Sequence, residues 1–246
     1  VQAGIVRATS ATIVVVSPTG HGTSSGFRSA QHSACWAANA AAPATLARLA
    51  REHRFTLVHY STDYVFDGGR DEHEEAEPFS PLGVYGQSKA AGDLAVATVP
   101  AHYILRTSWV IGDGRNFVRT MQDLAARGVS PEVVGDQDGR LTFTEELSRA
   151  TRHLVSSGAP FGTYNATNGG PVTSWAEIAR EVFRISGRDP GEVRLTTTTA
   201  YGAGKALAPR PQHSALSLAK LRATGFEPED AFSAMARYCS SPLGER

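Results

Sequence analysis

Runs of residues typical of β-strands alternate with runs typical of helices along most of this chain, and this alternation constrains the fold more than any other feature. The stretch 55–62 reads as a buried strand that ends at small polar residues, and 103–109 reads as the next strand. Between them, 83–99 reads as a helix. Strands alternating with helices are typical of a parallel sheet wrapped by helices. The other expected strands are 132–134 and 162–167, and the other expected helices are 36–53, 116–127, 144–156, 174–186, 216–223 and 230–238.

The first 35 residues do not follow this pattern. Residues 10–35 are rich in serine, glycine, threonine and histidine and show no helical period, so we expect an irregular N-terminal segment over 1–35. The apolar run Ile13–Val16 is too short for the core of a signal peptide or for a membrane span. The chain begins with Val1 rather than methionine, which is consistent with a fragment of a longer protein.

Charge and cysteine content argue against several classes of partner. The 24 basic and 24 acidic residues cancel, so we expect neither nucleic acid nor a membrane surface as a partner. The two cysteines, Cys35 and Cys239, lie far apart without a metal-ligand spacing, which favours a reduced, cytoplasmic protein. The eight histidines also lack metal-ligand spacing, so no metal site is predicted from the residues. The acidic run 71–77 and the stretch 196–210 read as solvated loops.

The motif with clear chemical meaning is the Tyr-x-x-x-Lys formed by Tyr85 and Lys89. Positions i and i+4 share one helix face, so the phenol and the ammonium are expected to point into one site. A nearby cation favours the phenolate, which would suit tyrosine to proton transfer during interconversion of a carbonyl and an alcohol. The alternative is a half-buried aromatic beside a surface lysine. The upstream run Ser61-Thr62-Asp63 favours the catalytic interpretation.

Longer stretches around this motif resemble one family closely. The runs 59–68, 81–92 and 105–109 resemble the dTDP-4-dehydrorhamnose reductases, members of the extended short-chain dehydrogenase/reductase superfamily. The runs 136–139 and 209–216 are similar to sugar-nucleotide-binding stretches of that family. The resemblance implies an α/β fold with a Rossmann-like doubly wound parallel sheet, N-terminally incomplete, and a small C-terminal substrate-binding lobe. The implied domains are residues 36–135 for the remaining NAD(P)-binding part and 136–246 for the mixed region that includes the lobe.

The resemblance implies an NAD(P)-dependent oxidoreductase that transfers a hydride from NADPH or NADH to C4 of a dTDP-4-keto-6-deoxyhexose. In the rhamnose route, dTDP-4-dehydrorhamnose would become dTDP-L-rhamnose. Tyr85 matches the proton donor, Lys89 matches the residue that holds the nicotinamide ribose, and Thr62 matches the hydroxyl that meets the substrate carbonyl. Two donors on one oxygen would stabilise the negative charge that develops there. The implied cofactor-binding residues are Ser61, Tyr85, Lys89, Thr107 and Ser108, and the implied substrate-binding residues are Thr62, Tyr64, Trp109 and Arg210.

Two departures from the family pattern stand out. Leu141 occupies a position where the family has proline. The chain also lacks the family's opening strand and Gly-x-x-Gly-x-x-Gly turn, which seats a pyrophosphate on a helix N-terminus. The run Thr12–Gly26 comes nearest, but its glycine spacing is wrong and Pro18 interrupts it, so we interpret it as a loop. Too few residues separate Gly20 from Tyr85 for further βαβ units of about 30 residues each.

Partners and alternative functions follow from the same resemblance. It implies a dTDP-sugar substrate, and either a homodimer or an association with a 3,5-epimerase. Some family members hold Mg2+ between subunits, which makes Mg2+ a further candidate without assigned residues here. The alternative is a non-catalytic homologue that binds a sugar nucleotide or a partner, similar to the regulatory subunit of methionine adenosyltransferase. A nucleotide-sugar epimerase or dehydratase fits less well, because those enzymes share Tyr-x-x-x-Lys but not the run 61–66.

Overall fold

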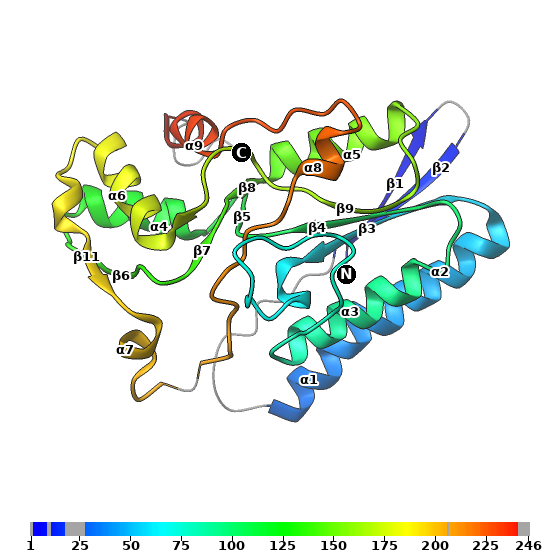
Figure 1. Cartoon of the computed structure of the whole chain (residues 1–246), viewed down its shortest axis with the longest axis horizontal. Coiled ribbons are helices and arrows are strands. Elements are labelled where there is room, and N and C mark those ends of the chain that lie inside the picture. Colours follow the sequence, from blue (N-terminus) through cyan, green and yellow to red (C-terminus); the bar gives the residue numbers. More distant parts are fainter. Residues whose placement is uncertain (1, 9–10, 18–27, 206, 241–246) are drawn as a thin grey trace.

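A five-stranded sheet forms the centre of one half of the molecule (Figure 1). The computed structural model describes residues 2–8, 11–17, 28–205 and 207–240. The strand order is β1-β2-β3-β4-β9, in which β1 is antiparallel to β2 and the other neighbours are parallel. The carboxyl ends of the parallel strands therefore share one edge of the sheet. The strands are β1 (Gln2–Ala8), β2 (Ala11–Ser17), β3 (Thr56–Thr62), β4 (His102–Thr107) and β9 (Gly162–Asn165).

Helices cover both faces of this sheet (Figure 1). Adjacent residues of a strand point to opposite faces, so Leu57 packs with the helices of one face and Val58 with α5 on the other. One layer contains α1 (Arg28–Trp36), the π-helical turn η1 (Ala37–Ala41), α2 (Ala42–His53) and α3 (Val84–Val96), and the opposite layer contains α5 (Thr144–Ser156) and α8 (Ala219–Arg222). The expected α/β fold with a doubly wound parallel sheet is confirmed.

The N-terminal part differs from the irregular segment that was expected. Residues 2–8 and 11–17 form β1 and β2, and β2 pairs in parallel with β3. Ile13–Val16 consists of β-branched residues, which fit a pleated sheet well. The glycines Gly20, Gly22 and Gly26 lie outside the described residues.

The first helical stretch also begins earlier than the expected residue 36. Helix α1 starts at Arg28 and continues through η1 into α2. Residues 32–34 are exposed, so this part of the helix needs no apolar stripe, and the hydrophobic pattern therefore did not reveal it.

A second core lies beside the sheet and is built mainly from helices (Figure 1). Ile178, Val182 and Phe183 of α6 pack there with α4 and with Met235 of α9. Asn116 caps α4 by accepting from the Arg119 N–H, and Ser174 caps α6 by accepting from the Glu177 N–H. The elements are α4 (Phe117–Ala126), α6 (Trp175–Ile185), α9 (Ala231–Ser240), β6 (Glu132–Val134) and β11 (Arg194–Thr196).

Short elements connect the two cores. The stretch expected as a loop over 196–210 contains α7, whose first turn is capped by Thr197 through the Ala200 N–H. A helix of five residues with a threonine cap is too short to show a periodic pattern of apolar residues, so the sequence pattern did not predict it. The short elements are β5 (Val110–Ile111), β7 (Asp138–Gly139), β8 (Thr142–Phe143), β10 (Thr173–Ser174), α7 (Thr198–Gly202) and the 3-10 turns η2 (Asp63–Val65) and η3 (Pro190–Glu192).

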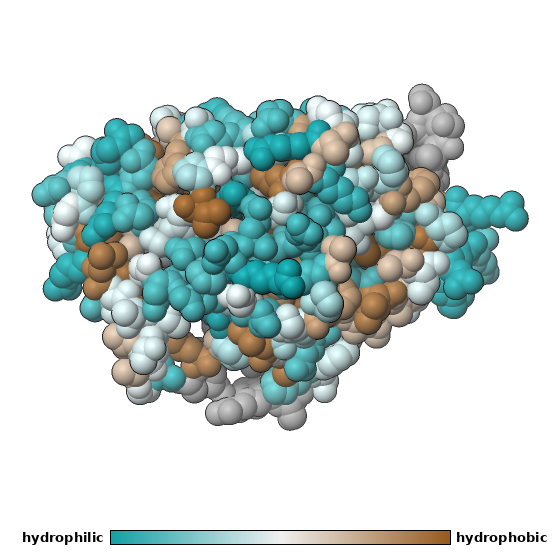
Figure 2. Space-filling view, in the orientation of Figure 1, coloured by the Kyte–Doolittle hydropathy of each residue, from teal (hydrophilic) through white to brown (hydrophobic). Residues whose placement is uncertain are grey.

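The chain passes between the two cores more than once. Helix α4 precedes residue 136 and packs in the second core, whereas β9 follows it and joins the sheet. The domain division at 135/136 stays a prediction. Across the described ranges, no helix combines the length and apolar character needed to cross a bilayer. Figure 2 shows apolar residues scattered in small groups among hydrophilic ones on the face drawn.

Candidate active site

The candidate site lies where β3 and β4 end. Thr62, the last residue of β3, pairs with Thr107, the last residue of β4, so both stand at the carboxyl edge of the sheet. Ligands of open α/β sheets bind outside this edge. The Thr62 hydroxyl accepts from the Tyr64 N–H at 3.2 Å and thereby caps the short turn η2, which fixes the residues that follow the strand.

Helix α3 brings Tyr85 to this edge. The rings of Tyr64 and Tyr85 meet edge to face, with centroids 5.6 Å apart and an interplanar angle of 78°. The Thr62 hydroxyl lies near enough to the Tyr85 phenol to affect its acidity. The structure therefore brings together the tyrosine and the threonine that the motifs predicted as neighbours.

Burial dominates the acidity of Tyr85. The pKa of its phenol is raised above the ordinary value of 10 by burial, and the neighbouring Thr62 hydroxyl opposes that rise only in part. The expected lowering of this pKa by Lys89 is wrong, because the lysine is directed elsewhere in this structure. Tyr85 therefore carries its proton at neutral pH and is suited to donate it.

Lys89 lies one turn after Tyr85 and is almost completely buried. Its ammonium donates to the backbone carbonyl of Tyr60 at 2.5 Å. Burial lowers the pKa of Lys89 to about 8, while the negative charge of Asp93 opposes that shift. The lysine is thus charged at neutral pH and is held against β3.

Asp63 was missed as a site residue, although it lies inside the Ser-Thr-Asp-Tyr run. Its carboxylate accepts from the Thr62 hydroxyl at 2.9 Å. Burial raises the pKa of Asp63 to about 6, against the opposing hydrogen bonds of Ser214 and Thr62. The side chains of Tyr85, Thr62 and Asp63 therefore form one group, in which the Thr62 hydroxyl donates to Asp63. The acidity of Asp63 also depends on folding, since Ser214 comes from a distant part of the sequence.

Arg210 acts electrostatically on one of the two tyrosines. Arg210 is exposed, and its charge acts on the Tyr64 phenol. The pKa of Tyr64 is raised by burial and by the charge of Asp63, whereas Arg210 lowers it. The charge of Arg210 therefore reaches the Tyr64 side of the candidate site.

The acidic run 71–77 is not the freely solvated loop that was expected. His73 is completely buried, and its Nδ1 lies 2.9 Å from the Glu77 carboxylate. Its backbone N–H donates to the Ala215 carbonyl at 2.9 Å, and its carbonyl accepts from the Ser217 N–H at 2.9 Å. This loop therefore fastens the segment that carries Ser214 to the rest of the site.

Three other predicted residues lie at the periphery of the pair formed by Thr62 and Tyr85. The hydroxyls of Thr107 and Ser108 donate to Thr142 Oγ1 at 2.9 Å and to the Arg140 carbonyl at 3.0 Å. Both side chains are buried and tie β4 to the following lobe. Ser61 is buried on the other side of β3, where its hydroxyl helps to keep the pKa of Asp93 low.

Trp109 has an unusual backbone conformation. Its φ of 46° lies in the left-handed region, which a bulky side chain adopts at a cost. Its ring stacks on Trp175 with centroids 4.0 Å apart, and Gly139 packs against its edge. The indole is therefore held between the sheet and the second core. The predicted pocket role of Trp109 stays a prediction.

Concave surfaces elsewhere contain none of the predicted site residues. Two open hollows of about 390 and 400 Å3 lie beside α6 and beside α5, respectively. Within the ranges that the structure describes, no group of three His, Cys, Asp or Glu residues is arranged to hold a metal ion.

Known proteins resemble this chain along most of its length. One relative from Streptomyces antibioticus, named probable dTDP-4,6-dihydroxy-2-methyloxan-3-one 4-ketoreductase, is 43% identical over 194 residues, which are 77% of this chain and 64% of that protein. The dTDP-4-dehydrorhamnose reductase of Streptomyces griseus is 40% identical over 200 residues, which are 78% of this chain and 64% of that protein. The chain thus spans 64% of the length of each of these two relatives, slightly less than two thirds.

A solved structure agrees with these sequence matches. The crystal structure of dTDP-4-dehydrorhamnose reductase from Bacillus anthracis, in complex with NADP, superimposes with a TM-score of 0.76 at 30% identity. The match covers 85% of this chain and 73% of that one. The family pattern described as RmlD substrate binding domain matches residues 28–241. The chain therefore belongs to the RmlD substrate binding domain family.

Proposed function

We propose that this chain is an NAD(P)H-dependent reductase of the C4 ketone of a dTDP-4-keto-6-deoxyhexose. For dTDP-4-dehydrorhamnose, the product would be dTDP-L-rhamnose. The observation that carries this proposal is the pair of neighbouring Tyr85 and Thr62 hydroxyls at the carboxyl edge of the sheet, with the buried ammonium of Lys89 one helical turn away. The names of the relatives support the substrate class, since both act on dTDP-linked sugars by name.

The two hydroxyls account for the proton side of the reaction. A reduced nicotinamide, when bound, supplies the hydride that C4 receives. Negative charge then grows on the ketone oxygen, where the Tyr85 O–H donates and gives up its proton, so that the alcohol forms. The Thr62 O–H, which donates to Asp63 in this structure, would turn to the same oxygen. Solvent then returns a proton to Tyr85.

The residues present fit the nicotinamide ribose end of NADPH or NADH. Tyr85 and Lys89 supply a phenol and an ammonium on one face of α3, which are donors suited to ribose hydroxyls. Ser61, Thr107 and Ser108 complete the proposed cofactor side, and Tyr64, Trp109 and Arg210 the proposed sugar-nucleotide side. Arg210 is suited to the diphosphate, because a guanidinium binds phosphate oxygens in a bidentate way. The pyrophosphate turn of the cofactor has no counterpart in the sequence.

The cellular context is part of the same proposal. We assign a dTDP-sugar as substrate, the cytoplasm as compartment, and either a second copy of the chain or a 3,5-epimerase as partner. Mg2+ is a further candidate, without assigned residues.

A direct assay tests the proposal. The purified chain is mixed with NADPH and a dTDP-4-keto-6-deoxyhexose, and the absorbance of the reduced nicotinamide is followed. Tyr85→Phe keeps the ring and removes the proton, so the rate is expected to fall by about 100-fold or more. Tyr201→Phe, the same change at an exposed tyrosine of α7, is expected to leave the rate unchanged.

Binding measurements separate this proposal from its rival. Affinities for NADPH and for dTDP are measured by calorimetry on the same preparations. Binding of dTDP without turnover of any 4-keto sugar would contradict the reductase and favour the non-catalytic homologue. A rate that Tyr85→Phe leaves intact would contradict the assigned proton donor.

A further inference from the structure

Four ionisable side chains are buried together behind the helix that carries Tyr85. Lys89 and Asp93 come from α3, His59 from β3 and Arg106 from β4, and none is more than 4% exposed. Asp93 follows Lys89 by four residues, so the two side chains share the face of α3 that packs on the sheet. Charges in such a place are costly unless they compensate one another.

Asp93 is held as a carboxylate by groups from two strands. Its Oδ2 accepts from Arg106 Nε at 3.1 Å, and its Oδ1 lies 3.3 Å from His59 Nε2. Burial alone would raise the pKa of Asp93, but His59, Arg106 and Ser61 together bring it below its ordinary value. Asp93 is therefore ionised at neutral pH.

Arg106 is fixed independently of Asp93. Its Nη1 donates to the Glu75 carbonyl at 3.0 Å, and the rings of Phe66 and Phe79 flank the guanidinium at 5.3 and 4.9 Å. The arginine thus presents one edge to Asp93 and cannot easily turn to another partner. This arrangement leaves Asp93 Oδ1 on the side of His59.

The cluster contains more positive than negative charge. Burial lowers the pKa of His59, so the imidazole is neutral, and Asp93 alone faces two cations in the cluster, Arg106 and Lys89. The titratable groups from the elements packed around Lys89 are Tyr85 and Asp93 of α3, His59 and Tyr60 of β3, Asp63 of η2, Arg106 of β4 and Cys35 of α1. Asp93 supplies the charge that opposes the desolvation of Lys89.

We propose that Asp93 is a positioning residue for Lys89: its carboxylate, one helical turn away on the buried face of α3, keeps the buried ammonium charged. The inference rests on the proposed role of Lys89 in binding the cofactor. Removal of the carboxylate would leave two buried cations without an anion, and the lysine is the one that can lose its proton. Asp93 therefore sets the pH range over which Lys89 acts, without contact with the substrate.

Nuclear magnetic resonance of labelled lysine tests this inference without turnover. The chain contains three lysines, Lys89, Lys205 and Lys220, so the ammonium signals are assigned with Lys205→Arg and Lys220→Arg. In the unaltered chain we expect Lys89 to titrate at about 8. In Asp93→Asn the pKa of Lys89 is expected to fall by about one unit or more. Asp123→Asn, the same change at an exposed position of α4, is expected to leave it unchanged.

A double variant tests the same effect in case Asp93→Asn alone does not fold. Asp93→Asn with Arg106→Gln removes the ion pair as a unit, so no unpaired arginine is left behind. Arg106 is not among the charges that act on Lys89, so the double variant is expected to show the same fall in the pKa of Lys89. Asp93→Glu restores the carboxylate and is expected to restore the titration near 8.

A third measurement needs no variant at Asp93. In the unaltered chain, the side-chain carboxyl signal of Asp93 is expected to shift as Lys89 loses its proton. An Asp93 signal that stays constant through the titration of Lys89 would overturn the inference. An unchanged pKa of Lys89 in Asp93→Asn or in the double variant would do the same.

Kinetics then separate this inference from the proposed function. In an active reductase, Asp93→Asn is expected to raise KM for NADPH and to move the alkaline limb of the pH profile down with the pKa of Lys89. A chain with the expected Lys89 titrations but no reductase activity would contradict the proposed function and leave the electrostatic role of Asp93 intact.

Discussion

At the scale of single residues, burial outweighs local charge in this site. Tyr85 and Asp63 both have pKa values above their ordinary ranges, with burial as the largest cause in each case. For Asp63 the consequence is a cost in stability, because the folded state holds a carboxylate that water would solvate better. Natural sites retain such destabilising groups where a function depends on them.

Asp63→Asn is therefore expected to stabilise the chain in a pH-dependent way. The folded pKa of about 6 exceeds the ordinary value of 3.8, so the folded state binds the Asp63 proton more tightly than the unfolded state. The contribution of Asp63 is neutral below the lower value and becomes unfavourable as pH rises from about 4 to 6, by roughly 3 kcal/mol in total. The asparagine side chain cannot ionise and keeps an acceptor for Thr62.

Urea unfolding at several pH values checks this expectation. The difference in free energy of unfolding between Asp63→Asn and the unaltered chain should be close to zero at about pH 4 and should grow through the titration range. Asp113→Asn, at an exposed loop position, serves as the control. A difference that does not change with pH would show that the carboxylate of Asp63 is not the cause.

At the scale of elements, two glycines of α3 lie closer to neighbouring backbone than a residue with a side chain could. A Cβ on Gly86 would lie 2.0 Å from the Tyr64 carbonyl oxygen, and a Cβ on Gly92 would lie 2.1 Å from that of Asn39. Asn39 sits in the π-helical turn η1 and donates to the Ser88 hydroxyl at 3.1 Å. Two glycines and one irregular turn thus set the position of Tyr85 relative to Thr62.

Gly86→Ala is expected to disrupt this approach. The neighbouring atoms belong to the Tyr64 backbone, so the helix itself must move away from η2 and separate Tyr85 from Thr62. We expect a loss of about 1–3 kcal/mol in stability and a larger proportional loss of reductase activity. Urea unfolding and the nicotinamide assay measure the two effects.

Gly202→Ala provides the matched control. Gly202 ends α7, and an added Cβ would meet Leu207 at an ordinary 3.6 Å. This variant is expected to be neutral or slightly more stable, by less than about 1 kcal/mol. Equal effects of the two substitutions would argue against close packing at Gly86.

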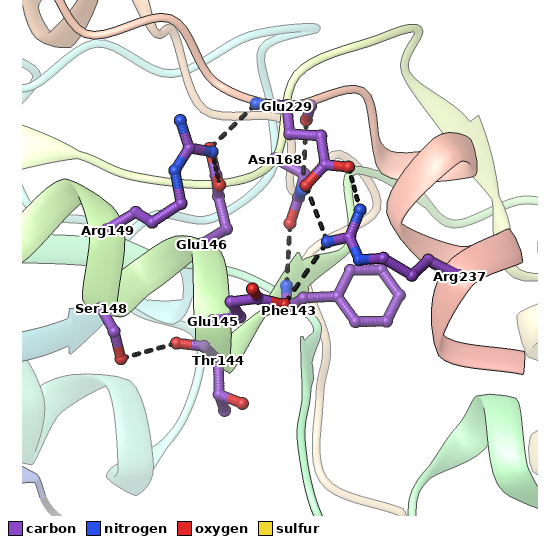
Figure 3. A network of polar contacts seen from close by, with 9 residues as sticks. All are labelled: Phe143, Thr144, Glu145, Glu146, Ser148, Arg149, Asn168, Glu229 and Arg237. Atoms are coloured by element: carbon purple, nitrogen blue, oxygen red, sulfur yellow. Dashed lines mark hydrogen bonds and ion pairs between the residues drawn. The ribbon is translucent and has the colours of Figure 1, made fainter. Parts of the chain in front are cut away.

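At the scale of the whole molecule, a polar network joins the sheet to the second core (Figure 3). Glu146 of α5 accepts from the Glu229 N–H at 2.9 Å and pairs with Arg149. Glu229 and Glu145 both contact Arg237 of α9. Since α5 packs on the sheet and α9 packs on α6, these contacts connect the two cores.

Glu146→Ala is expected to weaken this connection. The Glu146 side chain is 3% exposed, so its removal leaves the Glu229 N–H without its acceptor and is expected to cost about 2–3 kcal/mol of stability. Glu145→Ala changes the adjacent residue of the same helical turn, whose side chain is 64% exposed, and is expected to cost less than about 1 kcal/mol. Chemical unfolding compares the two, and similar costs would contradict a special role for the buried carboxylate.

The outline of the fold could be predicted from local pattern, and its N-terminal part could not. The strand at 56–62 and the helix at 144–156 show clear runs of suitable residues and match the expected ranges closely. Helix α1 was not predicted because the residues of its described turns are largely exposed and show no apolar stripe. The strands β1 and β2 were not predicted because their short β-branched run lies next to a segment rich in serine and glycine. Propensity is a weak guide where tertiary packing supplies most of the stability.

The sequence by itself determined the parallel α/β architecture, the family, and the pairing of Thr62 with Tyr85 at one edge of the sheet. These follow from periodicity and from motifs whose residues lie close together in the chain. Only the tertiary structure decided how the site is charged. It turned Lys89 towards Tyr60, buried Tyr85 and Asp63, and placed Asp93 between Arg106 and His59. Burial and the charges of residues distant in sequence set a pKa, and neither can be read from spacing along the chain.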